Sequence, residues 1–339
     1  MNKIIKTTNI NKQNLTDSFG RFHNYLRIAL LEKCNLRCLY CMPEKGIQLT
    51  PKEDILTTPE IIRLVNIFGN AGVNKIRLTG GEPTIHRDIL DITREIKRNS
   101  NIKNLAITTN GLITYRMLPQ LREAGLDGIN VSLDTLIEGK YQIMTRRKGF
   151  NNVMKTITKG LELGFDPVKV NCVVMRNQND DEINDFVALT KDKNINIRFI
   201  EYMPFDDNEW KEKKMVSFFE MKDKIQEKYG KLVRKRDHKT ETAKNFTLDG
   251  HVGSVSFITS MTNDFCGGCN RTRLLADGNY KVCLFDNREI SLRDAMRQGC
   301  SDEEILEIIN DAIMYKKEKH GGMHNIKEMK NRPMITIGG

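Results

Sequence analysis

Short apolar runs alternate with longer amphipathic stretches along the first two thirds of the chain. The apolar runs are rich in the β-branched residues that favour strands, and nearly every one is followed by a segment long enough for a helix. The predicted strands cover 25–31, 75–80, 104–110, 128–134, 168–175 and 195–203, and the predicted helices cover 58–70, 88–98, 114–124, 150–163 and 180–191. This βαβ rhythm predicts an α/β fold with a parallel sheet or an incomplete (β/α) barrel, rather than a sandwich.

The segment 58–70 shows how such a helix is signalled. Thr58 is a candidate N-cap, and Pro59 suits the first helical position because its missing N–H would be unpaired there in any case. One face of this helix is apolar and carries Ile61, Leu64, Val65 and Phe68. That periodic face predicts packing against the sheet.

Beyond Pro204 the rhythm stops. We expect a solvated loop over 206–214, a helix over 217–229, a strand over 254–259 and a helix over 302–317. The lysine-rich stretch 231–245 is either an anion site or a solvated excursion, and its composition favours the excursion. The predicted division is an N-terminal tail (1–17), a barrel domain (18–235) and a C-terminal α+β region (236–339).

Composition narrows the class of protein. The chain has 339 residues, 39% of them hydrophobic, and its 54 Lys+Arg outnumber its 44 Asp+Glu, for a net charge of +10. These values exclude a disordered or collagen-like chain and admit anionic ligands. No stretch approaches the roughly 18 apolar residues of a membrane span, and the first residues lack the apolar core of a signal peptide. We therefore expect a cytoplasmic protein without a membrane partner.

Six of the eight cysteines form two clusters, which favours metal ligands over disulfides. The first cluster, Cys34, Cys38 and Cys41, has C-x3-C-x2-C spacing directly after the first predicted strand. Three thiolates can hold a [4Fe–4S] cluster and leave one iron open for chemistry. Zinc would need a distant fourth ligand, because no His lies between His23 and His86. A thioredoxin-like Cys-x2-Cys pair would leave Cys34 unexplained.

The second cluster also has three cysteines and no obvious fourth ligand. Cys266 and Cys269 are followed, after thirteen intervening residues, by Cys283. This spacing fits a second cluster with an open iron. The alternative is a zinc knuckle completed by His251 or His324.

The stretch Asn270–Arg273 places two arginines beside the second cluster. Arginine suits the bidentate recognition of phosphate or carboxylate. The pair therefore indicates the seat of an anionic substrate, unless the arginines only balance the charge of the cluster.

The first cysteine cluster lies in CNLRCLYC (34–41), which resembles the signature of the radical S-adenosylmethionine (SAM) enzymes. The LTGGEP motif at 78–83 is also similar to a motif of that family, in which glycines bring the backbone close to the SAM amino group. The resemblance implies a TIM-like, incomplete (β/α)6 radical SAM barrel, followed by an α+β extension with a second iron–sulfur cluster. It also implies that SAM chelates the open iron of the first cluster and is cleaved to methionine and a 5′-deoxyadenosyl radical.

Further motifs resemble one branch of these enzymes, the GTP 3′,8-cyclases that open molybdenum cofactor biosynthesis. These motifs are TTNG (108–111), INVSLDTL (129–136), RFIEYM (198–203), CGGCNRTRLLADG (266–278) and the terminal Gly338–Gly339. The resemblance implies SAM and two [4Fe–4S] clusters as cofactors, with the iron ligands Cys34, Cys38, Cys41, Cys266, Cys269 and Cys283. The implied SAM contacts are Tyr40, Gly81, Ser132 and Met203. The implied GTP contacts are Arg27, Arg77, Thr108, Lys169, Arg271, Thr272 and Arg273, and the implied catalytic residues are Arg27, Arg271 and Arg273.

The positions of these residues along the predicted strands agree with the resemblance. Five of them lie within or just after the C-terminal part of a predicted strand, namely Arg77, Thr108, Ser132, Lys169 and Met203. Barrel enzymes place their sites at that end of the strands. We therefore expect these side chains to meet.

The implied reaction begins when the deoxyadenosyl radical takes a hydrogen atom from C3′ of GTP. The carbon radical then attacks C8, and reduction and protonation give (8S)-3′,8-cyclo-7,8-dihydroguanosine 5′-triphosphate. The family further implies an electron donor such as flavodoxin or ferredoxin, a cyclic pyranopterin monophosphate synthase as the next enzyme, and a homodimer. The Gly338–Gly339 tail is expected to reach the active site, although a frayed terminus would have the same sequence.

Two other functions stay open at this point. A radical SAM enzyme that modifies a peptide would also carry a cluster in a C-terminal extension, usually with more cysteines. An RNA-binding protein stabilised by iron or zinc would suit the positive charge, but such binding uses exposed aromatic platforms, and the stretch 231–245 has one neighbouring aromatic, Phe246. We therefore expect no nucleic-acid partner.

Overall fold

The computed structural model describes residues 14–206, 208, 210–329 and 331–338. Six parallel strands follow one another in chain order at the centre of a twelve-stranded sheet. They are β1 (Tyr25–Ala29), β2 (Lys75–Thr79), β3 (Asn104–Thr109), β4 (Gly128–Ser132), β5 (Val168–Val174) and β6 (Ile195–Glu201). All six were predicted, and the α/β fold with a parallel sheet is confirmed.

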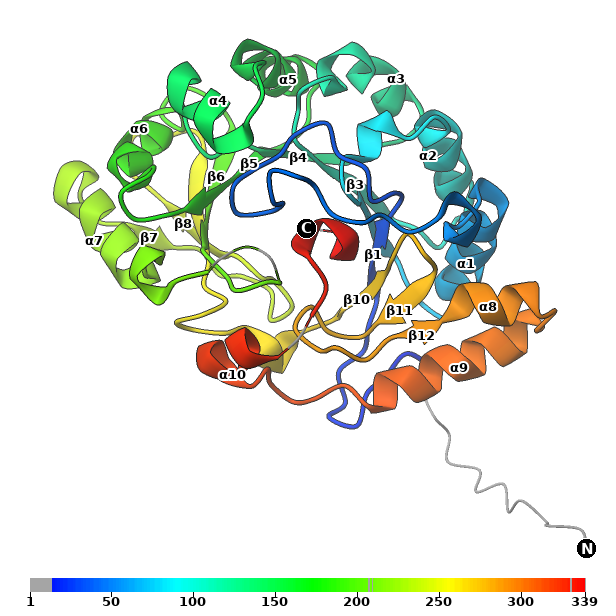
Figure 1. Cartoon of the computed structure of the whole chain (residues 1–339). Helices are drawn as coiled ribbons and strands as arrows, with labels where there is room; N and C mark the ends of the chain where they lie inside the picture. The colour runs from blue at the N-terminus through cyan, green and yellow to red at the C-terminus, as the bar shows by residue number, and fades with distance from the viewer. Residues whose placement is uncertain (1–13, 207, 209, 330, 339) are drawn as a thin grey trace, which may run out of the picture.

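The C-terminal region extends this sheet at both edges. At one edge β9 (Ser254–Ile258) runs parallel to β6, and β8 (Lys244–Thr247) and β7 (Val233–Arg234) lie beyond it. At the other edge β10 (Arg271–Leu274) runs parallel to β1, and β11 (Asn279–Lys281) and β12 (Ile290–Ser291) lie beyond it. The sheet curves around a central space in which the C-terminal turn, Met334–Ile337, lies (Figure 1). One sheet therefore crosses the predicted domain boundary at 235/236, and that division stays a prediction.

Helices cover the outer face of the curved sheet (Figure 1). They are α1 (Thr58–Asn70), α2 (Ile89–Arg98), α3 (Leu118–Glu123), α4 (Glu138–Thr145), α5 (Phe150–Glu162), α6 (Ile183–Ala188) and α7 (Phe218–Tyr229). The C-terminal region adds α8 (Leu292–Arg297), α9 (Asp302–Met314) and α10 (Gly322–Glu328). Short 3-10 turns are η1 (Lys52–Asp54), η2 (Pro83–Ile85), η3 (Thr114–Arg116), η4 (Asp180–Glu182), η5 (Glu212–Lys214), η6 (Cys266–Gly268) and η7 (Met334–Ile337).

The N-cap of α1 lies one residue before the predicted one. Thr57, not Thr58, is the N-cap, because Glu60 lies three residues after Thr57 and the two form a capping box. The Glu60 carboxylate accepts a 2.7 Å bond from the Thr57 backbone N–H. The Thr58 hydroxyl instead donates to Asp88, so it joins α1 to the start of α2.

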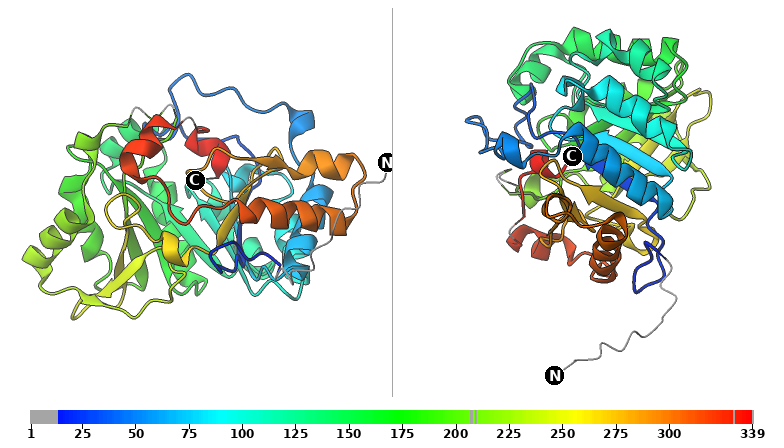
Figure 2. Two further views of the ribbon diagram at one scale, coloured as in Figure 1. Left: turned by 90° about the horizontal axis from the view of Figure 1, so that it is seen from below. Right: turned by 90° about the vertical axis from the view of Figure 1, so that its right-hand side faces the viewer.

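The C-terminal helices close the edge of the sheet that carries β10 to β12. Figure 2 shows α8 and α9 beside α1 at that edge. Ion pairs hold them there, because Arg63 of α1 contacts Asp302 at 2.7 Å and Arg297 of α8 contacts Glu60 at 2.7 Å. The predicted helix over 302–317 ends earlier, at Met314.

The predicted solvated loop over 206–214 is partly wrong. Trp210 and Asn208 are buried. The Trp210 indole donates to the Tyr202 carbonyl at 2.9 Å, and the Tyr202 hydroxyl donates to the Asn208 carbonyl at 2.7 Å. A large aromatic ring whose N–H finds a partner is stable when buried, and this explains why a mostly charged stretch folds back onto the protein.

Candidate active site

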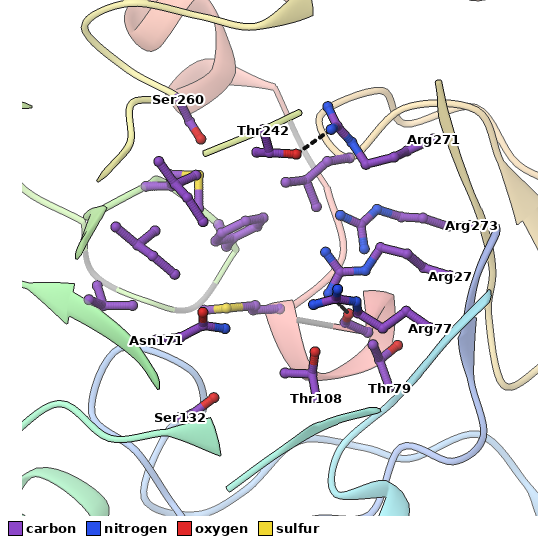
Figure 3. A pocket seen from close by; sticks show the side chains of 18 of the residues that line it. Arg27, Arg77, Thr79, Thr108, Ser132, Asn171, Thr242, Ser260, Arg271 and Arg273 are labelled. Atoms are coloured by element: carbon purple, nitrogen blue, oxygen red, sulfur yellow. Dashed lines mark hydrogen bonds between the residues drawn. The ribbon is translucent and has the colours of Figure 1, made fainter. Parts of the chain in front are cut away.

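A single cavity on the inner face of the sheet brings the predicted site residues together. All six clustered cysteines line it, as do the four predicted SAM contacts and every predicted GTP contact except Thr272. Figure 3 shows four arginines that reach into this cavity from one side, facing Ser132 and Asn171 on other strands. The sequence therefore identified the residues that meet here, and their roles stay predictions.

Strand register explains the row of arginines. Arg27 pairs in register with Arg273 on one neighbouring strand and with Arg77 on the other. Residues at the same register on adjacent parallel strands point to the same face. A second row lies two residues earlier, where Tyr25 pairs with Arg271 and Lys75.

Burial and mutual repulsion disfavour the charged forms of the cations in this cavity. Burial, with Arg273 as a close cation, holds the pKa of Arg27 well below its usual value. Burial and Arg271 lower the pKa of Arg273 to about 10. Burial, with Arg198 and Arg77, lowers the pKa of Lys169 to about 8. Cations held together in this way are stabilised by a bound polyanion.

Three polar side-chain atoms of residues that line the cavity are buried. The Nε of Arg77, the hydroxyl of Thr108 and the side-chain oxygen of Asn171 have no hydrogen-bond partner among the residues that the structure describes. Each of these residues lines the cavity. Because buried polar groups are nearly always paired in folded proteins, the three atoms indicate a polar ligand.

Two of the sequence predictions need correction. Thr272 is buried and does not line the cavity, because it alternates with Arg271 and Arg273 along β10 and faces the other side of the strand. Lys169 does line the cavity, but it is the second residue of β5 and not near its end. Its long side chain reaches the site from the N-terminal part of the strand.

Backbone hydrogen bonds to the end of α4 fix the first cysteine loop. The N–H of Arg37 donates to Thr145 O at 3.0 Å, and that of Leu39 donates to Met144 O at 2.9 Å. Burial raises the pKa of Cys38, and burial together with Cys34 raises that of Cys41 to about 12. Free thiolates are therefore disfavoured here, whereas a bound metal would deprotonate these thiols.

The GGEP motif needs glycine at both of its first positions. A Cβ on Gly81 would lie 2.1 Å from the Lys33 carbonyl, and one on Gly80 would lie 2.4 Å from the Leu31 carbonyl. Gly80 also has a φ of 135°, which favours glycine. The motif is thus pressed against the segment that leads into the cysteine loop, at the cavity wall.

The second cysteine set has a different charge environment. Burial raises the pKa of Cys266 to about 11. Burial would also raise the pKa of Cys269, but Arg271 and Lys316 lower it to about 6. The cations beside this set therefore favour a thiolate ligand.

The zinc alternative with His251 is excluded. The Nδ1 atom of His251 lies 2.7 Å from the Thr190 hydroxyl, its ring packs edge-on against Tyr229, and it does not line the cavity. The side chain of His324 lies outside the described residues. Within those residues, no three His, Cys, Asp or Glu side chains are grouped to hold a single metal ion. A cubane cluster makes a different demand, since it distributes its ligands over several iron atoms.

The C-terminal tail enters the same cavity. Arg27 donates to the Gly338 carbonyl at 3.2 Å, and Arg273 donates to the Ile337 carbonyl at 3.2 Å. The predicted reach of the tail to the site is confirmed for Gly338, and Gly339 lies outside the described residues.

Several lining residues were missed by the sequence analysis. Tyr25 and Lys75 lie two residues before Arg27 and Arg77, so strand alternation alone could have identified them. Arg198 lies in the middle of β6 and lines the cavity. Thr240, Glu241 and Thr242 also line it, although the composition of 231–245 favours a solvated excursion. No local signal in 231–245 shows that its tip returns to the cavity.

Comparison with known proteins decides the family. Residues 28–190 match the model of the radical SAM superfamily, and residues 195–322 match that of the molybdenum cofactor synthesis C-terminal domain. The mitochondrial GTP 3′,8-cyclase of Arabidopsis thaliana is 59% identical over 96% of this chain and 83% of its own length. The chain belongs to the GTP 3′,8-cyclase family. This membership confirms the predicted class, a radical SAM enzyme of molybdenum cofactor biosynthesis.

Other comparisons agree with this cyclase family. The GTP 3′,8-cyclase of Syntrophomonas wolfei is 42% identical over 96% of this chain and 100% of its own length. The chain spans about half the length of its mammalian relatives, which are named molybdenum cofactor biosynthesis protein 1. A crystal structure of Streptococcus suis SuiB has a TM-score of 0.61 at 14% identity, covering 92% of this chain and 69% of that one. At that identity the likeness shows the fold alone.

Proposed function

We propose that this chain is a radical SAM GTP 3′,8-cyclase that converts GTP into (8S)-3′,8-cyclo-7,8-dihydroguanosine 5′-triphosphate. The observation that carries the proposal is one cavity lined by two three-cysteine sets, with a row of arginines on the strands that join them. Membership of the cyclase family supports the same reaction.

The two cysteine sets fit two [4Fe–4S] clusters. Cys34, Cys38 and Cys41 would hold the cluster that binds SAM, and Tyr40, Gly81, Ser132 and Met203 line the cavity beside them. Cys266, Cys269 and Cys283 would hold the second cluster. SAM bound at this cluster would supply the 5′-deoxyadenosyl radical needed to take the hydrogen atom from C3′ of GTP.

The protein's own contribution is binding, orientation and exclusion of water. Arg27, Arg77, Arg271, Arg273 and Lys169 bind the triphosphate, and charge-assisted hydrogen bonds contribute about 1.5 to 3 kcal/mol each. Arg198 joins this set because it lines the same cavity and faces the same cations. The proposed substrate would then lie between the two cysteine sets, which line the same cavity as these cations.

The remaining partners are part of the proposal. A flavodoxin or ferredoxin supplies electrons, a cyclic pyranopterin monophosphate synthase takes the product, and the chain forms a homodimer. A cytoplasmic location stays a prediction. Among the described residues no helix is long and apolar enough to cross a membrane, and the Arabidopsis relative is named as mitochondrial.

The test is an anaerobic assay of the reconstituted protein with SAM and a reductant. It measures 5′-deoxyadenosine and cyclised nucleotide in the presence of GTP, ATP or no nucleotide. We expect both products with GTP and no cyclised product with ATP. Deoxyadenosine without any product derived from GTP would keep the radical chemistry and overturn the substrate, in favour of a radical SAM enzyme that acts on another molecule such as a peptide.

A further inference from the structure

Lys316 is a buried cation that has no carboxylate partner among the described residues. Two lysines are buried among the described residues, Lys281 and Lys316. Lys281 has an acidic partner, because its ammonium lies 3.4 Å from the Glu289 carboxylate. In the described part of the chain no carboxylate forms such a pair with Lys316, although a buried charge is costly unless it is paired.

The contacts of Lys316 point to the second cysteine set. Its ammonium lies 3.3 Å from the sulfur of Cys269 and donates to the Arg271 carbonyl at 2.8 Å. Burial lowers the pKa of Lys316, and Cys269 and Cys283 act against that lowering. The partner that this cation lacks is therefore the negative charge that these thiolates carry when they bind iron.

The position of Lys316 is fixed by a second residue, Arg21. This guanidinium donates to the Cys266 carbonyl at 2.8 Å, and also to the carbonyls of Lys317 and Glu318 at 2.8 and 2.7 Å. Its Nε is held by Asp17 at 2.6 Å. One side chain thus joins the cysteine loop to the turn that carries Lys316, so the ammonium and the Cys269 sulfur are held together.

We propose that Lys316 is a positioning residue that sets the reduction potential of the second iron–sulfur cluster, by placing an ammonium and its N–H group against Cys269. The inference rests on the second [4Fe–4S] cluster of the proposed function. Reduction adds one electron to the cluster and moves no proton, so the reduced form is more negative by one charge. A fixed cation in a low-dielectric surrounding stabilises that form, and hydrogen bonds to sulfur act in the same direction.

The test is a potentiometric titration of the second cluster, monitored by electron paramagnetic resonance. Replacing Cys34, Cys38 and Cys41 by Ala removes the first cluster, so the reduced second cluster alone gives a signal. Lys316→Met removes the charge and the donor, whereas Lys316→Gln keeps a donor without charge. Lys319→Met is the matched control, because Lys319 lies three residues away and is exposed.

We expect a more negative midpoint potential in Lys316→Met than in the parent, and an unchanged midpoint in Lys319→Met. If the midpoint of Lys316→Gln is also more negative, the effect comes from the charge. If the midpoint of Lys316→Gln is unchanged, the effect comes from the hydrogen bond. If Lys316→Met takes up no iron, Lys316→Gln decides alone, and its midpoint must then be more negative than that of the parent. Unchanged midpoints at full iron and sulfide content would overturn the inference.

This outcome is separable from failure of the proposed function. The titration contains neither GTP nor SAM, so it does not depend on turnover. An unshifted midpoint overturns the role of Lys316 alone. A parent protein that binds no second cluster overturns that role and the proposed function together.

Discussion

At the scale of single residues, the site depends on which side chains alternate onto the inner face of the sheet. Arg271 and Arg273 reach the cavity, and Thr272 between them does not. The motif indicated all three residues equally, because a sequence resemblance does not show to which side of a strand each side chain points. Strand periodicity would have separated them, if the strand Arg271–Leu274 had been predicted.

The two cysteine sets are expected to divide the chemistry between them. Cys34→Ala should abolish SAM cleavage, because it removes a ligand of the cluster that binds SAM. Cys283→Ala should abolish cyclised product and leave uncoupled SAM cleavage. The measurement is deoxyadenosine and nucleotide product in purified, folded variants of known iron content. Equal loss of SAM cleavage in both variants would contradict this division.

Arg271 is expected to act on GTP and not on iron. Its guanidinium lies 4.8 Å from the Phe265 ring centre and donates to the Thr242 hydroxyl, and as a permanently charged group it is not a ligand for iron. Loss of a charge-assisted bond of about 1.5 to 3 kcal/mol should lower kcat/KM for GTP by about tenfold to a hundredfold in Arg271→Ala. Iron content should stay unchanged. Arg288→Ala, at an exposed position, is the control, and equal kinetics in the two variants would remove Arg271 from the site.

Lys169 gives the site a pH dependence. Burial, with Arg198 and Arg77, lowers its pKa to about 8, so the ammonium is present below that pH and lost above it. We expect kcat/KM for GTP, which reports groups of the free enzyme, to fall as the pH rises through about 8. In Lys169→Arg this fall should disappear, because a guanidinium stays charged throughout that range.

Tyr25 is the control for this pH profile. Its pKa would be raised by burial, but Arg77, Arg27 and nearby cations lower it to about 8. Its phenolate would also oppose triphosphate binding above that pH. A fall that persists in Lys169→Arg and disappears in Tyr25→Phe would assign the effect to the phenol and contradict the role of Lys169.

At the scale of elements, one buried carboxylate joins the ends of two strands. Glu82, after β2, accepts bonds from the hydroxyls of Thr84 and Thr109 and from the backbone N–H of Asn110 after β3. Asn110 in turn donates to Asn35 at 2.7 Å in the first cysteine loop. The GGEP and TTNG motifs therefore form one structural unit that supports the cysteines.

Glu82→Gln is expected to weaken this unit. The NH2 group of the glutamine would face the hydroxyl and N–H groups that donate to the carboxylate. Such an unsatisfied buried group costs about 1 to 3 kcal/mol. The free energy of unfolding of the apoprotein, measured by denaturant titration, should fall by that amount. Glu227→Gln, a change at an exposed position of α7, should leave it unchanged. Equal stability of the two variants would show that the buried bonds are not needed.

Elements with a strong local pattern were predictable, and those defined by distant partners were not. The six central strands and α1, α2 and α5 follow from periodicity, because each buries one face or both. The strand β10 was missed, since its parallel partner β1 lies about 246 residues earlier in the chain. The segment 206–214 was predicted as a solvated loop because most of its residues are charged. Burial of the one aromatic side chain, Trp210, holds the segment against the protein all the same.

At the scale of the whole molecule, the last residues of the chain return to its first strand. A bridge from Asp206 to Pro333 and bonds from the Asn331 N–H to the Asp206 carboxylate hold the start of the tail. Arg332 contacts Asp277 at 2.7 Å and also pairs with Glu289. The tail therefore reaches Arg27 and Arg273 from an anchored starting point.

Arg332→Ala tests whether that anchor matters for the site. Without the guanidinium, Asp277 and Glu289 lose their shared partner, and the segment that ends at Gly338 is no longer held at the cavity. We expect several-fold less cyclised product at unchanged iron content, together with faster removal of the tail by a carboxypeptidase. Lys327→Ala, at an exposed position of α10 close by in the chain, should change neither quantity. Normal product from a tail that is readily digested would show that its place in the cavity is not required for cyclisation.

The same variant tests whether the tail and GTP compete, because the carbonyls of the tail accept bonds from the arginines that the triphosphate needs. A lower KM for GTP in Arg332→Ala would indicate competition. A lower kcat with an unchanged KM would indicate that the tail and the substrate are bound at the same time.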